Sequence, residues 1–209
     1  IASCLVGSEM CIRDSNMAER QSHGFKFETN WCKQNNVLTW KQYEKKYGKQ
    51  KGSNYTSKWD AINENIKGKN YKGKPVQIKC IGLNNAIELG DIFRNSNKEE
   101  DFTLVVGFWV GKKTNIVDVV VLDIDHKKWN KLFVWDKFDE VKDWIKNRVS
   151  NSHSYDEQWK TEMNYYKGLW GDRLVTPTFK RDHKKQRRIQ CQISYINFMQ
   201  EFVNNKICK

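Results

Sequence analysis

The stretch KGKPVQIKCIG, residues 72–82, decides how this chain is interpreted. A Gly-Lys-Pro turn leads into a run in which Val76, Ile78 and Cys80 alternate with Gln77 and Lys79. Apolar residues that recur with a period of two predict a strand with one buried face. Gln77 and Lys79 therefore point together to the opposite face, where an amide and an ammonium group lie side by side.

The composition predicts one domain, or one domain with a small appendage, and a basic protein with a polyanionic partner. The 209 residues are 38% hydrophobic, which is enough for a core, and 37 Lys and Arg against 25 Asp and Glu leave a net charge of +12. Such an excess favours nucleic acid first and an acidic membrane surface second. A basic protein without such a partner is the alternative. No apolar run approaches the length of a membrane span.

The first residues differ in character from the rest of the chain. The sequence IASCLVGSEMCIRDSN, residues 1–16, lacks an initial Met, and Met17 follows it. Glu9 interrupts the apolar stretch that a signal peptide needs. Because LVGSEMCIRDS resembles a translated sequencing adapter, we expect residues 1–16 to be a non-native, disordered leader.

The six cysteines indicate a reducing, intracellular (cytoplasmic) setting. They form no CxxC pair, and no His lies at zinc-ligand spacing beside them. Cys80 and Cys191 fall in apolar strand patterns and are interpreted as inert core thiols. The histidines, His23, His126, His153 and His183, are interpreted as surface residues.

Local patterns predict helices around a sheet of about four or five strands. Helices are expected around Glu28, over 39–47 with a Thr39–Gln42 capping box, over 86–95, over 136–148, and from a Ser154–Glu157 capping box onward. A short helix is expected over 197–205. Strands are expected over 75–81, in a hairpin of 101–110 with 115–125, and over 188–196. Residues 58–66 are ambiguous between strand and helix, and 173–188 predict a loop. The fold class is therefore α/β or α+β.

An amide beside a lysine on one strand face suits phosphodiester hydrolysis once a carboxylate is added. Magnesium binds carboxylate and amide oxygens and retains waters, while an ammonium group can orient a hydroxide. Asp60, seventeen residues before Gln77, supplies the carboxylate if residues 58–62 form a strand beside 75–79. A solvated strand face, with Asp60 at a helix start, is the alternative.

These residues resemble the motif of the PD-(D/E)XK nuclease superfamily, which includes many type II restriction endonucleases. The resemblance implies a restriction-endonuclease-like core with a mixed central sheet. It makes Asp60 and Gln77 the metal ligands, Lys79 the catalytic lysine and Glu28 the extra acid of some members. The sequence departs from the motif in two places: Trp59 stands where Pro precedes the Asp, and Gln77 replaces the second acid. A helix near 86–95 followed by the long hairpin is the order that the resemblance implies.

The basic stretch 180–188 is the candidate DNA-binding segment, within a C-terminal part of about 172–209. Dense like charges favour phosphate contact, and Arg also reads guanine, whereas a solvated basic loop is the alternative. Arg94 contacts a phosphate or forms an exposed ion pair with Asp91, and the ion pair is favoured. No role is given to Asp118 or Asp123. The candidate DNA-binding residues are Lys180, Arg181, Lys184, Lys185, Gln186, Arg187, Arg188 and Arg94.

The sequence therefore leads to one main hypothesis. Residues 17–209 form a single domain of a DNA endonuclease that depends on Mg²⁺, for which Mn²⁺ substitutes. The partner is double-stranded DNA, not a membrane, and symmetric cutting favours a homodimer. The alternatives are a homing or repair nuclease of the same superfamily, and a catalytically inert nucleic-acid-binding protein on a degenerate nuclease fold.

Overall fold

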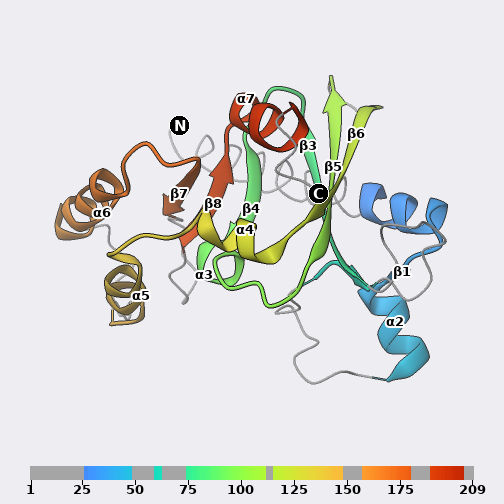
Figure 1. Ribbon diagram of the computed structural model, residues 1–209, viewed down its shortest axis with the longest axis horizontal. Helices are drawn as coiled ribbons and strands as arrows, with labels where there is room; N and C mark the ends of the chain where they lie inside the picture. Colours follow the sequence, from blue (N-terminus) through green and yellow to red (C-terminus); the bar gives the residue numbers. More distant parts are fainter. Residues whose placement is uncertain are drawn as a thin grey trace, which may run out of the picture. The chain divides into compact units, whose positions relative to one another are not determined.

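The strand expected within residues 72–82 is present as β3, Pro75–Gly82, in the computed structural model (Figure 1). The structure describes residues 26–48, 59–62, 74–111, 115–147, 157–179 and 189–204. The predictions for the leader 1–16 and for the basic stretch 180–188 lie outside these residues. The fold contains helices and two sheets and is of the α+β class.

The chain divides into two compact units. The first combines residues 1–83 with 103–121, and the second combines residues 84–102 with 122–209. The first unit therefore contains the motif strand and most of the predicted hairpin, and the second contains the C-terminal strands.

A mixed sheet of five strands organises the first unit, in the order β1 (Leu38–Thr39), β2 (Ala61–Ile62), β3, β5 (Phe102–Val110) and β6 (Asn115–Ile124). The first three strands pair antiparallel, and β3 pairs with β5 in parallel. β5 and β6 are neighbours and only residues 111–114 separate them, which confirms the predicted hairpin. Within the ambiguous segment 58–66, residues 61–62 form the strand β2, and residues 63–66 lie outside the described residues.

One face of this sheet is covered by the helix of residues 26–34. Phe27, Trp31 and Cys32 of the helix pack with Val37, Ala61, Val76, Ile78 and Val105. Gly107 of β5 allows close approach, because a Cβ there would overlap the Phe27 ring. The predicted helix around Glu28 is confirmed, and its buried side chains lie on the side of Val76 and Ile78.

The helix α2, Trp40–Tyr47, begins where the local pattern predicts. Thr39 is the N-cap, its hydroxyl accepts from the Gln42 backbone N–H, and the Gln42 side chain accepts from the Thr39 N–H. Gly48 caps the C-terminus with a φ of 87°, in the region that favours glycine. Both ends of α2 are therefore explained by adjacent residues.

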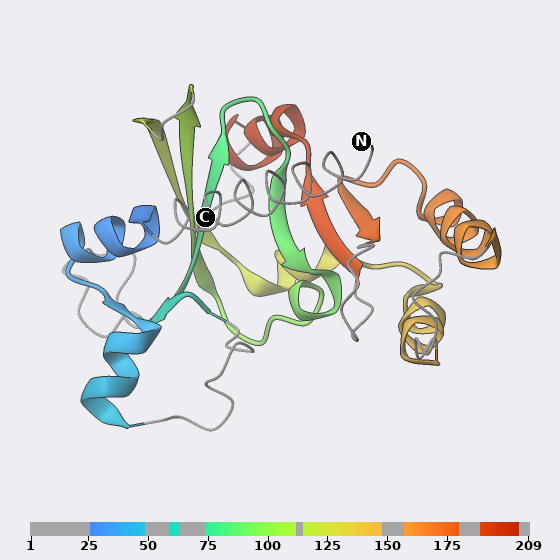
Figure 2. The ribbon, with the colours of Figure 1, turned by 180° about the vertical axis from the view of Figure 1, so that it is seen from behind.

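The second unit contains a separate antiparallel sheet in the order β4 (Ile87–Asp91), β8 (Ile189–Ile193) and β7 (Val175–Phe179), visible side by side in Figures 1 and 2. The chain adds α3 (Ile92–Asn95), α4 (His126–Lys131), α5 (Phe138–Asn147) and α6 (Glu157–Trp170). The last described elements are α7 (Tyr195–Phe198) and the π-helix η1 (Met199–Asn204). The predicted helices over 136–148 and 197–205 are confirmed in their described residues. The strand predicted over 188–196 is present only as β8, because Ser194 caps α7 and Tyr195 is helical. Ser154 lies outside the described residues.

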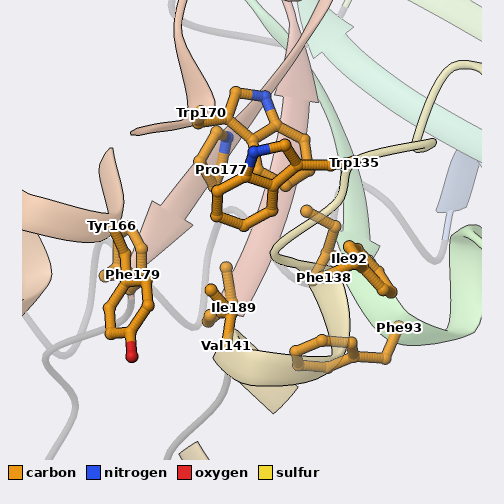
Figure 3. A pocket seen from close by; sticks show the side chains of 10 residues that line it. All are labelled: Ile92, Phe93, Trp135, Phe138, Val141, Tyr166, Trp170, Pro177, Phe179 and Ile189. Atoms are coloured by element: carbon orange, nitrogen blue, oxygen red, sulfur yellow. The ribbon is translucent and has the colours of Figure 1, made fainter. Parts of the chain in front are cut away.

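Aromatic packing joins this sheet to α5 and α6. Trp135 and Trp170 meet edge to face with ring centroids 4.9 Å apart, and Phe138 lies 6.4 Å from Trp170. Figure 3 shows these rings with Pro177 and Ile189 of the sheet around one small apolar pocket. The sheet side chains that face the helices are therefore the core of this unit.

Three predictions of secondary structure are wrong. Residues 86–95 are not one helix, because Ile87 and Leu89 are buried while Glu88 is exposed, a period of two that forms β4, and only α3 is helical. Residues 173–188 are not loop throughout, since 175–179 form β7. One central sheet was predicted, but β4, β7 and β8 form a second sheet. The connection from β3 to β5 thus contains a strand and a four-residue helix, unlike the single helix that the resemblance implies.

Candidate active site

Asp60 lies directly before β2, where its side chain continues the pairing of the two strands. Its backbone N–H donates to the Val76 carbonyl at 3.0 Å, and its Oδ2 accepts from the Ile78 backbone N–H at 2.7 Å. The carboxylate therefore satisfies an amide that a longer β2 would have paired with a backbone carbonyl. Asp60 is held against β3 by two bonds, which supports a defined rotamer.

Lys79 on β3 meets this carboxylate. Its Nζ lies 3.8 Å from Oδ2 of Asp60, and the side chains of Lys79 and Asp60 are 23% and 34% exposed. An ion pair with this exposure contributes little to stability. Both groups remain accessible enough to meet a ligand.

Gln77 lies on the same face of β3 as Lys79, because side chains alternate along a strand. The pairing of β2 with β3 ends at Ala61↔Val76, and Asp60 lies at a bend directly before it. Gln77 is only 6% exposed. The alternative of a solvated strand face is therefore wrong for this residue.

Glu28 on the 26–34 helix belongs to the same electrostatic environment. Burial and the nearby Asp60 carboxylate raise the pKa of Glu28 from 4.5 to about 7, and Lys79 and Lys41 oppose this increase. Because burial outweighs the attraction of two lysines, the carboxyl lies in a poorly hydrated place. Glu28, Asp60 and Lys79, from three separate segments of the first unit, are thus electrostatically coupled.

Cys32 lies one helical turn after Glu28 and is buried. Burial, together with the Glu28 and Asp60 carboxylates, raises the pKa of the Cys32 thiol to about 12. The thiol is neutral at ordinary pH and is a poor nucleophile. Cys191 is also buried, as predicted, whereas Cys80 is half-buried and burial raises the pKa of its thiol.

The predicted ion pair between Asp91 and Arg94 is wrong. Asp91 is the N-cap of α3 and its Oδ1 accepts from the Arg94 backbone N–H at 3.0 Å. The Arg94 side chain is exposed and forms no ion pair with a described residue. The other seven candidate DNA-binding residues, all within 180–188, lie outside the described residues. The residues that flank this stretch, Phe179 and Ile189, pair with each other across β7 and β8.

A second cluster of polar side chains, in the second unit, was not predicted. Asp101, Asp125 and His126 have ligand atoms within 4.8 Å of one another, and His126 Nδ1 lies 2.7 Å from Asp101 Oδ1. The His126 side chain is 25% exposed, so it lies partly at the surface. Asp125 caps α4 through the Lys127 and Lys128 amides. These hydrogen bonds explain why the three side chains lie together, and no cation is needed for that. In the sequence, the only sign of this cluster was that Asp125 and His126 are adjacent.

Comparisons with protein-family models, with curated proteins and with solved structures found no match to this chain. Within the described residues, no helix has both the length and the apolar character needed to cross a membrane.

Proposed function

We propose that this chain is a magnesium-dependent endonuclease that hydrolyses phosphodiester bonds in double-stranded DNA, in the manner of type II restriction endonucleases. The observation that carries the proposal is the meeting of Lys79 and Asp60 at 3.8 Å beside the poorly hydrated Glu28 carboxyl. Perturbed carboxylates beside a lysine are more frequent at functional sites than elsewhere. The arrangement also agrees with the motif by which the sequence resembles the PD-(D/E)XK superfamily.

The donor set suits magnesium. Oδ2 of Asp60 is occupied by Ile78 and Lys79, while its Oδ1 makes no hydrogen bond or ion pair with a described residue. Glu28 offers a second carboxylate, and Gln77, which holds the second-acid position of the motif, offers an amide oxygen. Hard oxygen ligands of this kind suit Mg²⁺ and Mn²⁺. Asp60, Glu28 and Gln77 are the residues that would hold the cation.

The protein's own groups explain the rest of the reaction. A bound cation would polarise the phosphate and acidify a water molecule. The Lys79 ammonium donates hydrogen bonds to the attacking water and stabilises the hydroxide formed from it. Because Glu28 would be held on the cation as a carboxylate, the proton that the water releases passes to bulk solvent. The water oxygen attacks phosphorus in line as the bond from phosphorus to the leaving deoxyribose oxygen breaks, and that oxygen takes up a proton from solvent.

A plasmid-cleavage assay tests this function. The wild-type chain should cut supercoiled plasmid in MgCl₂ or MnCl₂, and EDTA should abolish cutting. Asp60→Asn should lower the rate by about 10² or more. The control Asp118→Asn, at an exposed carboxylate on β6, should cut at the wild-type rate. Discrete fragments are expected of a restriction-type enzyme, and light scattering should give a dimer mass for symmetric cutting.

The same samples distinguish a nuclease from a catalytically inert nucleic-acid-binding protein. Labelled duplex is titrated with wild-type chain in CaCl₂, and cleavage is followed in parallel in MgCl₂. Tight binding without any cleavage would overturn the nuclease proposal and favour the nucleic-acid-binding protein. Cleavage that survives in Asp60→Asn would remove the site described above.

A further inference from the structure

We propose that the outer face of the three-stranded sheet β4-β8-β7 reads base edges in the major groove of duplex DNA. This inference rests on the proposed function insofar as DNA is the ligand. It assigns base recognition to the strands of the second unit, in residues that belong neither to the candidate active site nor to the basic stretch 180–188.

The sheet has one apolar and one polar face. Ile189, Cys191 and Ile193 of β8 are buried, whereas Gln190 and Gln192 between them are half-exposed. The register places Thr176 and Glu88 on either side of Gln192, and Thr178 and Asp91 on either side of Gln190. The outer face is thus two rows of three residues, each with a side chain able to form hydrogen bonds: Thr176, Gln192, Glu88 and Thr178, Gln190, Asp91.

A bulge maintains this pattern on β4. The register shifts between Glu88 and Gly90, so that Leu89 is an extra residue in β4 and Asp91 returns to the outer side opposite Gln190. Gly90 has a φ of 92°, a conformation that glycine adopts without strain. Bulges re-aim side chains in this way and are frequent near functional sites.

The composition of the face differs from that of an ordinary wet sheet surface. In a chain with 37 Lys and Arg, an exposed sheet face would be expected to carry lysines, yet the four central positions on β7 and β8 are amides and hydroxyls. The side chains of Gln190 and Gln192 make no hydrogen bond within the described part of the chain. Among the described residues, therefore, nothing occupies their donor and acceptor groups.

The spacing fits the edges of stacked bases. Gln190 and Gln192 are two residues apart, or about 7 Å along the strand. That is about two base-pair steps of roughly 3.4 Å, so the two amides would address base pairs two steps apart. The major groove admits a two-stranded ribbon, here β7 and β8, in which Gln pairs with adenine N6 and N7 and Thr contacts the thymine methyl.

Charge makes DNA the occupant of this face. The ends of β7 and β8, Phe179 and Ile189, are connected by nine residues of which six are Lys or Arg. Among the described residues, the exposed Arg94 lies in α3, three residues after Asp91 at the end of β4. Basic residues at the ends of the β7–β8 ribbon, whose outward Thr and Gln side chains are uncharged, would contact phosphates and position the protein, while the ribbon specifies the sequence through base contacts.

A binding selection tests the inference without cleavage. Wild-type chain in CaCl₂ is used to select from a randomised double-stranded oligonucleotide library, and the bound pool is sequenced. We expect a defined motif. Gln190→Ala and Gln192→Ala should each relax one position of it by about ten- to a hundredfold. Asn164→Ala, which removes an exposed amide on α6, should select the wild-type motif, and thermal unfolding should be alike for all variants.

Gln and Glu have nearly the same shape, so a Gln-to-Glu substitution tests the hydrogen-bonding role of the amide alone. Gln192→Glu removes the amide donor and should change the preferred base at its position from adenine to cytosine, which a merely structural role would not produce. Selection of the unchanged wild-type motif by all three Gln variants would overturn the inference, as would a wild-type pool without any motif. Failure of the proposed function is a separate outcome, because it would appear as a normal motif with no plasmid cleavage in MgCl₂.

Discussion

Replacing Glu28 with Gln should change how the stability of the metal-free protein depends on pH. The folded pKa of about 7 lies above the ordinary value of 4.5, so between these values the folded state binds more protons than the unfolded state. Stability of the wild-type chain therefore falls as pH rises from about 4.5 to 7, relative to a variant that cannot ionise. Below this window the carboxyl is protonated in both states, and above it the destabilisation is complete.

The magnitude follows from the size of the pKa change. The interval from 4.5 to about 7 corresponds to an upper limit of about 3 kcal/mol at roughly 1.4 kcal/mol per pKa unit. Partial exposure of Glu28 reduces this to the order of 1–2 kcal/mol. For a chain of this length, that difference is about 2–8 °C in Tm.

Thermal unfolding in EDTA from about pH 4 to pH 8, a range that spans the expected window, measures the effect. The Tm of Glu28→Gln minus that of wild type should increase across the window and then become constant. Glu100→Gln, which removes an exposed carboxylate, controls for the removal of one surface charge. A difference that stays flat over the whole range would show that the pKa of Glu28 is not raised in the folded protein. Above the window, MgCl₂ should stabilise wild type more than Glu28→Gln, because only the wild type keeps both carboxylates for the cation.

Three further predictions address catalysis, packing and DNA binding. Lys79→Ala should lower turnover by about 10² or more while duplex affinity in CaCl₂ stays near wild type; equal cleavage rates would leave Lys79 without a catalytic role. Gly107→Ala should destabilise the first unit by about 1–3 kcal/mol, because its methyl overlaps the Phe27 ring, and an unchanged Tm would contradict this packing. Replacing Arg187 and Arg188 together with Ala should weaken duplex binding and reduce its salt dependence by about one unit of slope for each phosphate that is no longer neutralised, whereas identical affinity at two salt concentrations would show that they do not contact phosphate.

Local structure followed from neighbouring residues. The ends of α2 depend on Thr39, Gln42 and Gly48, and these lie within a few bonds of the helix that they cap. The alternation of β3 and β8 was likewise visible in the sequence, since a strand with one buried face needs apolar residues at every second position.

The predictions of secondary structure were wrong for segments whose structure depends on the strand with which they pair. Ile87, Ile92 and Phe93 suited a helix by spacing, but pairing with β8 makes the first part of that segment a strand. Pro177 suggested a loop, yet β7 is an edge strand of the three-stranded sheet, where proline is tolerated because one side needs no ladder donors. Neither pairing could be read from the segment alone.

In the candidate site too, some features follow from neighbouring residues and others from tertiary packing. That Gln77 and Lys79 share a face follows from the sequence alone, because it depends only on the two-residue period of a strand. The tertiary structure was needed to show that Asp60 reaches the Ile78 amide, that Lys79 Nζ lies 3.8 Å from Asp60 Oδ2 and that Gln77 is buried. It also decided the raised pKa of Glu28, since desolvation depends on which segments pack around a carboxyl and not on its neighbours in the chain.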